Sequence, residues 1–281
     1  AKVEDQAVVW DLARPDQPRV LGRVPVQAVP ASGPPRPGQE DESFPGLRLS
    51  PDGSRASLVT ADRGTVRLLD VTADPPTPVG EVAVPGKLVR LAWHPSAPVL
   101  ALIAAEPDGR CSVVLRNVTT GQQLASCDGI PADNAVTSAA FSRNGQWLAV
   151  ASLADPTVRV YGALDGAERF RVTDAAVLGV TDLFWTPSGE LATVGMMEGL
   201  KLWRPDEAPP GDVLFRLRPA GRPAFSRDGR WLAVFSPLEA ARPSERAARL
   251  ALGKAIARDR VAVVDRRAGR VARMLPCAAG T

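Results

Sequence analysis

Histidine is almost absent from this sequence, which contains only His94. A Ser-His-Asp triad or a Cys-His pair would have to use this one imidazole, and no cysteine is near it in the sequence. The GxSxG motif of hydrolases is also missing, and no second histidine or cysteine stands at metal-ligand spacing from His94. We therefore expect His94 to be a turn residue on the rim of the fold, and we expect no catalytic residue and no metal site.

Cysteine is scarce as well, with Cys111, Cys127 and Cys277 as its three occurrences. Three is an odd number, and no CxxC pair or zinc spacing is present. A domain of this size can bury a sufficient core without a disulfide framework. The sequence therefore predicts free and mostly buried thiols.

Long apolar runs and an excess of one charge are also missing. The longest apolar stretches, such as 99–105, are too short to cross a bilayer, and the first residues do not form a basic-then-apolar leader. The formal net charge is only +3, from 34 basic and 31 acidic residues, so charge alone indicates no nucleic-acid or membrane partner. No nucleotide, phosphate or EF-hand motif occurs. We expect a cytoplasmic protein with no cofactor, and the sequence indicates no particular small-molecule ligand. Because the chain begins at Ala1 without Met, we also expect a fragment of a longer protein.

What the sequence does contain is a repeat. A short apolar run followed by a turn recurs as LRLSPDG (47–53), LAWHPSA (91–97), AAFSRNG (139–145), LFWTPSG (183–189) and PAFSRDG (223–229). The equivalent turn residues Pro51, Pro95, Arg143, Pro187 and Arg227 are separated by 44, 48, 44 and 40 residues. A period near 45 residues is typical of repeat architectures.

Each repeat unit contains four short runs with strand character. In one unit these are AAFS, WLAVASL, TVRVYGA and ERFRVT, separated by turn residues. The runs are rich in Val and Leu and are too short and too alternating for helices. A single four-stranded sheet buries little apolar surface, whereas several sheets packed face to face in a ring bury a continuous core. The sequence therefore predicts an all-β propeller of four-stranded antiparallel blades.

These units resemble WD40 repeats of a divergent bacterial type. The resemblance rests on the SPDG-like turn after the first strand, on the Trp10-Asp11 pair that closes a third strand, and on ADRGTVRLLD (61–70). It covers nearly the whole chain, although the Gly-His pair of the family is absent and most units lack the Trp-Asp pair. The resemblance implies a propeller that binds other proteins, without the His/Asp hydrogen-bond network of the family.

The repeat also predicts how the chain divides. Residues 1–281 form one domain, in which 1–24 supply only the third and fourth strands of a half blade. The five complete blades are expected at 44–85, 88–128, 136–173, 180–218 and 221–276. Two further strands would be needed beyond these residues to close a ring. A closed ring of six blades is our first choice, and a parent protein with seven or eight blades is the alternative.

Two sets of residues have both a functional and a structural interpretation. Four carboxylates precede the third strands of successive units and could ring a channel and bind a cation; turn residues that bond their own backbone are the favoured interpretation. The set is Asp62, Asp108, Asp155 and Glu198. The six tryptophans fall in or beside predicted strands, so we expect core packing between blades. They are Trp10, Trp93, Trp147, Trp185, Trp203 and Trp231.

Two insertions interrupt the period. Residues 30–44 are rich in Pro and Gly, and residues 237–259 are rich in Ala, Leu and Arg, with one short helix expected at about 244–257. Both are solvated loops in the simplest interpretation, but loops on rigid scaffolds carry much function. The partner-binding candidates are therefore Glu40, Asp41, Glu42, Arg242, Arg246, Arg249, Lys254 and Arg258.

Three functions compete at this point. The first is a non-catalytic scaffold that binds another protein or domain. The second is a sensory or regulatory module of a larger bacterial enzyme such as a Ser/Thr protein kinase, since similar propellers are often fused to kinases; the chain itself has no HRD or DFG motif. The third is a propeller hydrolase, which the poverty of ligand residues disfavours. Fold alone does not decide between them.

Overall fold

The described residues of the chain form an all-β structure. The computed structural model describes residues 6–11, 19–25, 47–60, 62–73, 75–107, 111–127, 130, 136–153, 155–173, 175–176, 179–195, 199–204, 224–236, 260–267 and 270–276. Every strand pair recorded in them is antiparallel. The all-β class predicted from the repeat is therefore confirmed.

The strands assemble into sheets of neighbours in the sequence. The two-stranded sheet contains β1 (Gln6–Asp11) and β2 (Arg19–Pro25). The next sheet contains β3 (Leu47–Leu49), β4 (Arg55–Val59), β5 (Thr65–Asp70) and β6 (Thr77–Ala83). The third contains β7 (Lys87–Trp93), β8 (Val99–Ala105), β9 (Cys111–Asn117) and β10 (Gln123–Cys127).

The second half of the chain repeats this pattern. One sheet contains β11 (Val136–Phe141), β12 (Trp147–Ser152), β13 (Val158–Gly162) and β14 (Glu168–Val172). A three-stranded sheet contains β15 (Val180–Trp185), β16 (Leu191–Gly195) and β17 (Gly199–Trp203). The last sheet contains β18 (Ala224–Phe225), β19 (Trp231–Ser236), β20 (Arg260–Asp265) and β21 (Arg270–Pro276).

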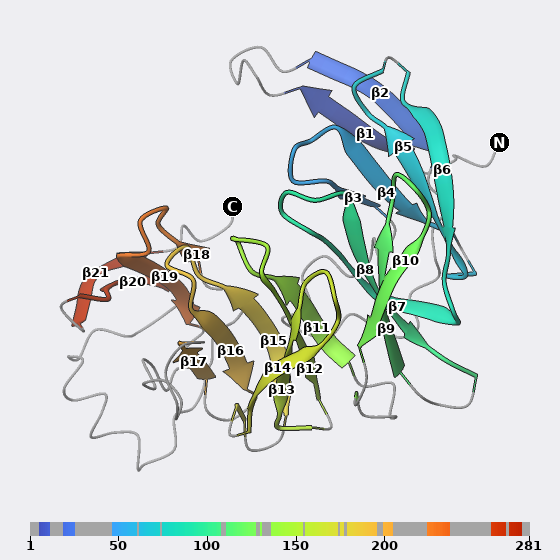
Figure 1. Ribbon diagram of the computed structural model, residues 1–281. Helices are drawn as coiled ribbons and strands as arrows, with labels where there is room; N and C mark the ends of the chain where they lie inside the picture. Colours follow the sequence, from blue (N-terminus) through green and yellow to red (C-terminus); the bar gives the residue numbers. More distant parts are fainter. Residues whose placement is uncertain are drawn as a thin grey trace.

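The sheets follow one another along an arc in the order of the chain, as Figure 1 shows. The first strands β7, β11 and β15 lie next to one another on the inner side of the arc, where β11 contacts both of the others. The outer strands β6, β10 and β14 are mostly exposed, whereas β8, β12 and β16 are almost wholly buried. This gradient is expected when sheets pack face to face and leave only their outer edges in water.

Alternation along the buried strands explains how one sheet serves two neighbours. In β8, Val99, Ala101 and Ile103 face a cluster that includes Leu148 and Tyr161 of the following sheet. Leu100 and Leu102 point the other way, into a cluster with residues of β4 and β5. Because successive side chains of a strand lie on opposite faces, a strand buried on both faces reads as a continuous apolar run. The run VLALIAA is therefore consistent with a strand between two other sheets.

Most of the expected strands are present, and some of the expected segments lie outside the described residues. Four of the five predicted blades have four strands each, the fifth shows three, and the piece at the start has two strands, as predicted. The expected fourth run of the β15–β17 sheet, DVLFRL (212–217), lies outside the described residues. Both insertions, 30–44 and 237–259, also lie outside them, together with the predicted helix. The limits of the single domain and the number of blades in a closed ring stay predictions.

Candidate interaction surfaces

The antiparallel order gives the arc two faces, which we name by their connections. The turn face carries the connections between the first and second strands of each sheet and those between the third and fourth strands. The loop face carries the connections between the second and third strands and those from one sheet to the next. Consecutive strands run in opposite directions, so these two sets of connections lie at opposite ends of the strands.

A hydroxyl residue organises the first turn of several sheets on the turn face. The Ser50 hydroxyl donates to Asp52 and accepts from the backbone N–H of Arg55 at 2.9 Å. Ser142 and Ser226 accept in the same way from the N–H groups of Trp147 and Trp231 at 2.9 Å. The Ser50 hydroxyl, followed by the Ser54 N–H, holds the pKa of the Asp52 carboxyl at about 2. The turn signals read from the sequence are confirmed, and their bonds satisfy the backbone locally.

His94 occupies the corresponding place in the turn between β7 and β8, and it reaches the next sheet. Its Nδ1 accepts from the backbone N–H of Ala97 at 2.8 Å and of Ser96 at 3.2 Å, so Nε2 carries the proton. Nε2 then donates to the carbonyl of Gly145 at 2.9 Å. The side chain is only 4% exposed. The expected turn position is correct, but the burial and the bridge between sheets were not foreseen.

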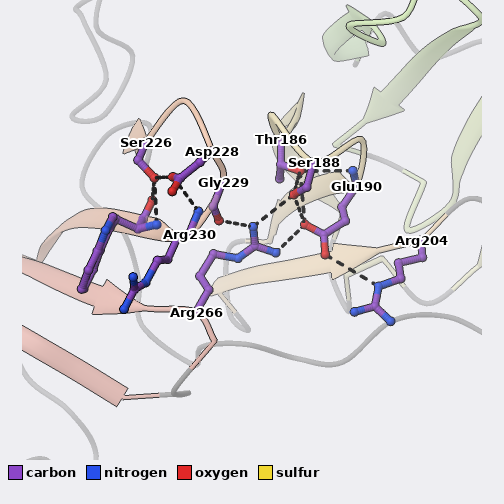
Figure 2. A network of polar contacts seen from close by, with 10 residues as sticks. Thr186, Ser188, Glu190, Arg204, Ser226, Asp228, Gly229, Arg230 and Arg266 are labelled. Atoms are coloured by element: carbon purple, nitrogen blue, oxygen red, sulfur yellow. Dashed lines mark hydrogen bonds and ion pairs between the residues drawn. The ribbon is translucent and has the colours of Figure 1, made fainter.

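A larger polar network joins the turns of the last two sheets, as Figure 2 shows. Arg266 donates to the carbonyl of Gly229 at 2.7 Å and forms an ion pair with Glu190. Arg204 approaches the other oxygen of Glu190 at 3.7 Å. The hydroxyl of Ser188 also donates to Glu190, at 2.9 Å. Glu190 therefore links two turns of its own sheet to the turns of the following sheet.

The electrostatics of this network favour the ionised carboxylate. Burial opposes ionisation of Glu190, but the hydrogen bonds from Arg266 and Ser188 and the positive charge of Arg266 outweigh it, so the pKa lies below its ordinary value. Asp228 is an exposed neighbour whose pKa is lowered mainly by the Ser226 hydroxyl and then by the N–H of Arg230. Both groups are structural anions at neutral pH.

The loop face shows a different repeated feature, a β-bulge near the start of the inner strand. The register shifts between Leu88 and Arg90 in β7, and equivalent shifts precede Ser138 in β11 and Asp182 in β15. The Ser138 hydroxyl donates to Asp182 of the next sheet at 2.8 Å. Bulges re-aim side chains and are frequent beside functional sites. The sequence carried no signal for them, because a bulge depends on the partner strand.

The carboxylates proposed as turn residues behave as such where they are described. Asp62 accepts from the Thr60 hydroxyl at 2.6 Å and from the Gly64 N–H at 3.0 Å. Asp155 accepts from the Thr157 N–H and from Arg159. Asp108 and Glu198 lie outside the described residues. Within the described ranges, no three His, Cys, Asp or Glu residues are grouped as a metal site would require.

Four of the six tryptophans, Trp93, Trp147, Trp185 and Trp203, pack between sheets, as expected. Trp203 is buried in the cluster shared by the β11–β14 and β15–β17 sheets, and Trp147 and Trp185 pack against it. The indole N–H of Trp93 donates to Ser57 at 3.1 Å and that of Trp185 to the carbonyl of Ala140 at 3.0 Å, each in the preceding sheet. The predicted free and buried thiols are confirmed for Cys111 and Cys127; Cys277 is not among the described residues.

None of the partner-binding candidates read from the sequence can be placed. Glu40, Asp41, Glu42, Arg242, Arg246, Arg249, Lys254 and Arg258 all lie outside the described residues. The chain topology attaches both of their segments to the loop face, because one joins two sheets and the other joins β19 to β20. In the part of the chain that is described, no helix is long and apolar enough to cross a membrane.

Comparison with known proteins supports the interpretation of the repeat. Residues 121–162, which run from β10 to the end of β13, match the family model "WD domain, G-beta repeat". No curated protein sequence matches the chain. Among solved structures, a chain from the "Crystal Structure of Mitotic Checkpoint Complex" is similar with a TM-score of 0.62 and 16% identity, over 97% of this chain and 72% of that chain. One stretch of the chain therefore matches a WD40 repeat, and the arc of antiparallel sheets together with the structural likeness gives the chain the β-propeller fold.

Proposed function

We propose that this chain is a protein-interaction scaffold without catalytic activity of its own, and that its partner docks on the loop face. The observation that carries the proposal is the bulge repeated in β7, β11 and β15. It occurs at equivalent positions of three successive sheets, where Arg90 and Asp182 are half-buried and Ser138 is buried beneath Asp182, to which it donates a hydrogen bond. A rigid array of equivalent positions with different side chains suits recognition of an extended partner surface.

The geometry of His94 supports the absence of catalysis. A general base needs an accepting nitrogen within reach of substrate. In His94 one ring nitrogen accepts two backbone N–H groups and the other donates to Gly145. We expect no turnover of lactone, ester or phosphoester substrates by this chain. Activity that disappears in His94→Ala while the fold persists would contradict this part of the proposal.

The two insertions supply further candidates on the same face. One carries the acidic residues Glu40, Asp41 and Glu42, and the other carries the basic residues Arg242, Arg246, Arg249, Lys254 and Arg258. Exposed ion pairs contribute only about 0–1 kcal/mol each, so these charges have little use in stability. Charged residues at the edge of an interface orient the partner and accelerate its association. We propose Arg246, Arg249 and Arg258 as partner contacts.

The test compares partner recovery by the intact chain with recovery by a variant in which residues 241–257 are replaced by a Gly-Ser linker. The matched control carries Arg48→Ser and Arg67→Ser, two exposed cations on the β3–β6 sheet. The proposal expects recovery of a chemically cross-linked partner to fall in the linker variant alone, with circular dichroism unchanged. Equal recovery from all three folded proteins would remove the case for this face.

A regulatory module of a larger bacterial enzyme, such as a Ser/Thr kinase, is our second proposal. It uses the same scaffold, with the fused domain as the docked partner. Its support lies in the resemblance of the repeats to propellers found in such enzymes. Reading the gene upstream of Ala1 tests it, since a kinase domain there would establish it and any unrelated domain would contradict it.

A further inference from the structure

The turns of different sheets can be compared position by position on the turn face, because equivalent positions form the same backbone hydrogen bond. The backbone N–H just after the third strand donates to the first turn of its own sheet in four sheets. The donors are Val71, Val118, Ala163 and Arg266, at 2.8–3.0 Å from the carbonyls of Ser54, Pro98, Gln146 and Arg230. In three sheets this position holds a buried apolar side chain. In the last sheet it holds Arg266.

The neighbouring positions of the last sheet depart from the repeat in the same direction. Arg230 stands where the other sheets have Ser54, Pro98 and Gln146. Arg267 stands where they have Thr72, Thr119 and Leu164. The last sheet thus has arginine at three positions, 230, 266 and 267, where the equivalent positions of the other sheets have polar or apolar residues. This is a local departure from the repeat. Such departures are expected at functional sites.

Two buried carboxylates form ion pairs with arginines whose own side chains stay largely in contact with solvent. The side chains of Glu190 and Asp265 are only 13% and 10% exposed, whereas those of their partners Arg204 and Arg230 are 60% and 42% exposed. Figure 2 shows Arg204 and Arg266 on opposite sides of Glu190. Arg227 and Arg267 are exposed too. Among the described residues of these turns, Asp228 is the one exposed carboxylate, against the exposed Arg204, Arg227 and Arg267 and the half-exposed Arg230.

Contacts within the chain partly fix the orientation of the Arg230 guanidinium in the absence of a partner. Arg230 lies over the ring of Trp231, with 4.7 Å between the guanidinium carbon and the ring centroid. It also donates to Asp265 at 3.0 Å. A guanidinium held by stacking and an ion pair loses less conformational entropy when it binds a planar anion. Carboxylates are the groups that such forks bind in bidentate fashion.

We propose that these four residues, Arg204, Arg227, Arg230 and Arg267, form an arginine surface that binds an acidic peptide segment of a partner protein. The site lies on the turn face, opposite the loop face of the proposed function, and it does not depend on that function. A nucleic acid is the less suitable ligand, because the whole chain carries a net charge of only +3 and Asp228 sits within the surface.

The test measures binding of a fluorescein-labelled hexaglutamate peptide to the full chain by fluorescence anisotropy. The test variant is Arg227→Ser with Arg267→Thr, which takes the residue type that other sheets have at the second position. The matched control is Arg143→Ser with Arg48→Ser, which removes the same charge and includes the same turn position in the β11–β12 turn. Thermal melts establish that each variant is folded, and hexaglutamine and a twelve-residue oligothymidylate complete the set.

The proposal expects hexaglutamate to bind the parent and the control equally and the test variant about tenfold more weakly, in line with two exposed charge pairs. Binding should weaken at high salt, as expected of exposed charges. Equal loss in test and control variants would assign binding to net charge and overturn the proposal. Binding of hexaglutamine as tight as that of hexaglutamate would also overturn it. Tighter binding of oligothymidylate, lost in the test variant, would replace the acidic peptide by a nucleic acid.

Discussion

At the scale of single residues, a glycine of one sheet meets the turn of the sheet before it. Gly145 has φ of +71°, and a Cβ added there would stand 2.5 Å from Cε1 of His94. Gly229 has φ of +68°, and a Cβ there would stand 3.0 Å from Oγ of Ser188. These turns therefore need glycine for two reasons, the left-handed backbone and the close approach between sheets.

Gly53 meets only the first of these requirements, the left-handed backbone. Its φ is +70°, but no atom lies within 4 Å of an added Cβ. Gly53→Ala should lower the free energy of unfolding by about 1 kcal/mol through the left-handed backbone alone. Gly145→Ala should cost about 3 kcal/mol, because it also displaces the hydrogen-bonded ring of His94. Urea unfolding of both variants measures the difference. Equal costs would show that the His94 bridge contributes nothing.

The ion pair of Glu190 predicts a specific dependence of stability on pH. Its folded pKa lies below the ordinary value of 4.5, so the ionised group stabilises the fold above pH 4.5 and this contribution is lost as pH falls through the folded pKa. Glu190→Gln should therefore lower the free energy of unfolding by about 2 kcal/mol at pH 7. The variant should lose less stability than the parent when pH falls below 4.5.

Urea midpoints measured at pH 7, 5, 4 and 3 check this expectation. Asp52→Asn is the control, since Asp52 has a pKa of about 2 and its contribution disappears only between pH 3.8 and about 2. Parallel pH curves for the parent and Glu190→Gln would mean that Arg266 does not stabilise the ionised carboxylate.

At the scale of elements, the sequence predicted strands well because the blade is a local pattern. WLAVASL became β12 and TVRVYGA became β13, since alternating or continuous apolar runs between turn residues have few other solutions. The turn formed by Ser50, Asp52 and Gly53 is also local, and it could be predicted equally well from the sequence. Both features depend on residues within one repeat.

The parts of the site that the sequence did not reveal depend on contacts between repeats. Glu190 and Arg266 are 76 residues apart, and His94 and Gly145 are 51 apart. No spacing rule links such positions, because their proximity follows only from packing one sheet on the next. The bulges at Arg90, Ser138 and Asp182 were equally hidden, since register is a property of two strands.

At the scale of the whole molecule, a sheet in the middle of the arc is stabilised by neighbours on both of its faces. The β7–β10 sheet contributes to two apolar clusters, one with the preceding and one with the following sheet. The β11–β14 sheet likewise contributes to two. Among the described residues, the β18–β21 sheet contributes to one cluster, through Leu232, Val234, Ala262 and Val264. Its other face leaves Ala233, Val261 and Val263 half-buried.

This difference predicts a gradient of local stability along the arc. Full burial of an aliphatic side chain contributes about 1.5–3 kcal/mol, and local opening is easier where fewer apolar contacts must be broken. Backbone amides of β8, β9, β12 and β13 should therefore exchange at least tenfold more slowly than those of β19 and β20, after correction for intrinsic rates. Hydrogen exchange read by mass spectrometry measures this directly, and repeating it at two protein concentrations excludes self-association. If β19 and β20 exchange as slowly as β12 and β13 at both concentrations, the second face of the last sheet is covered in solution. The nearest-neighbour account of stability would then be wrong for that end of the arc.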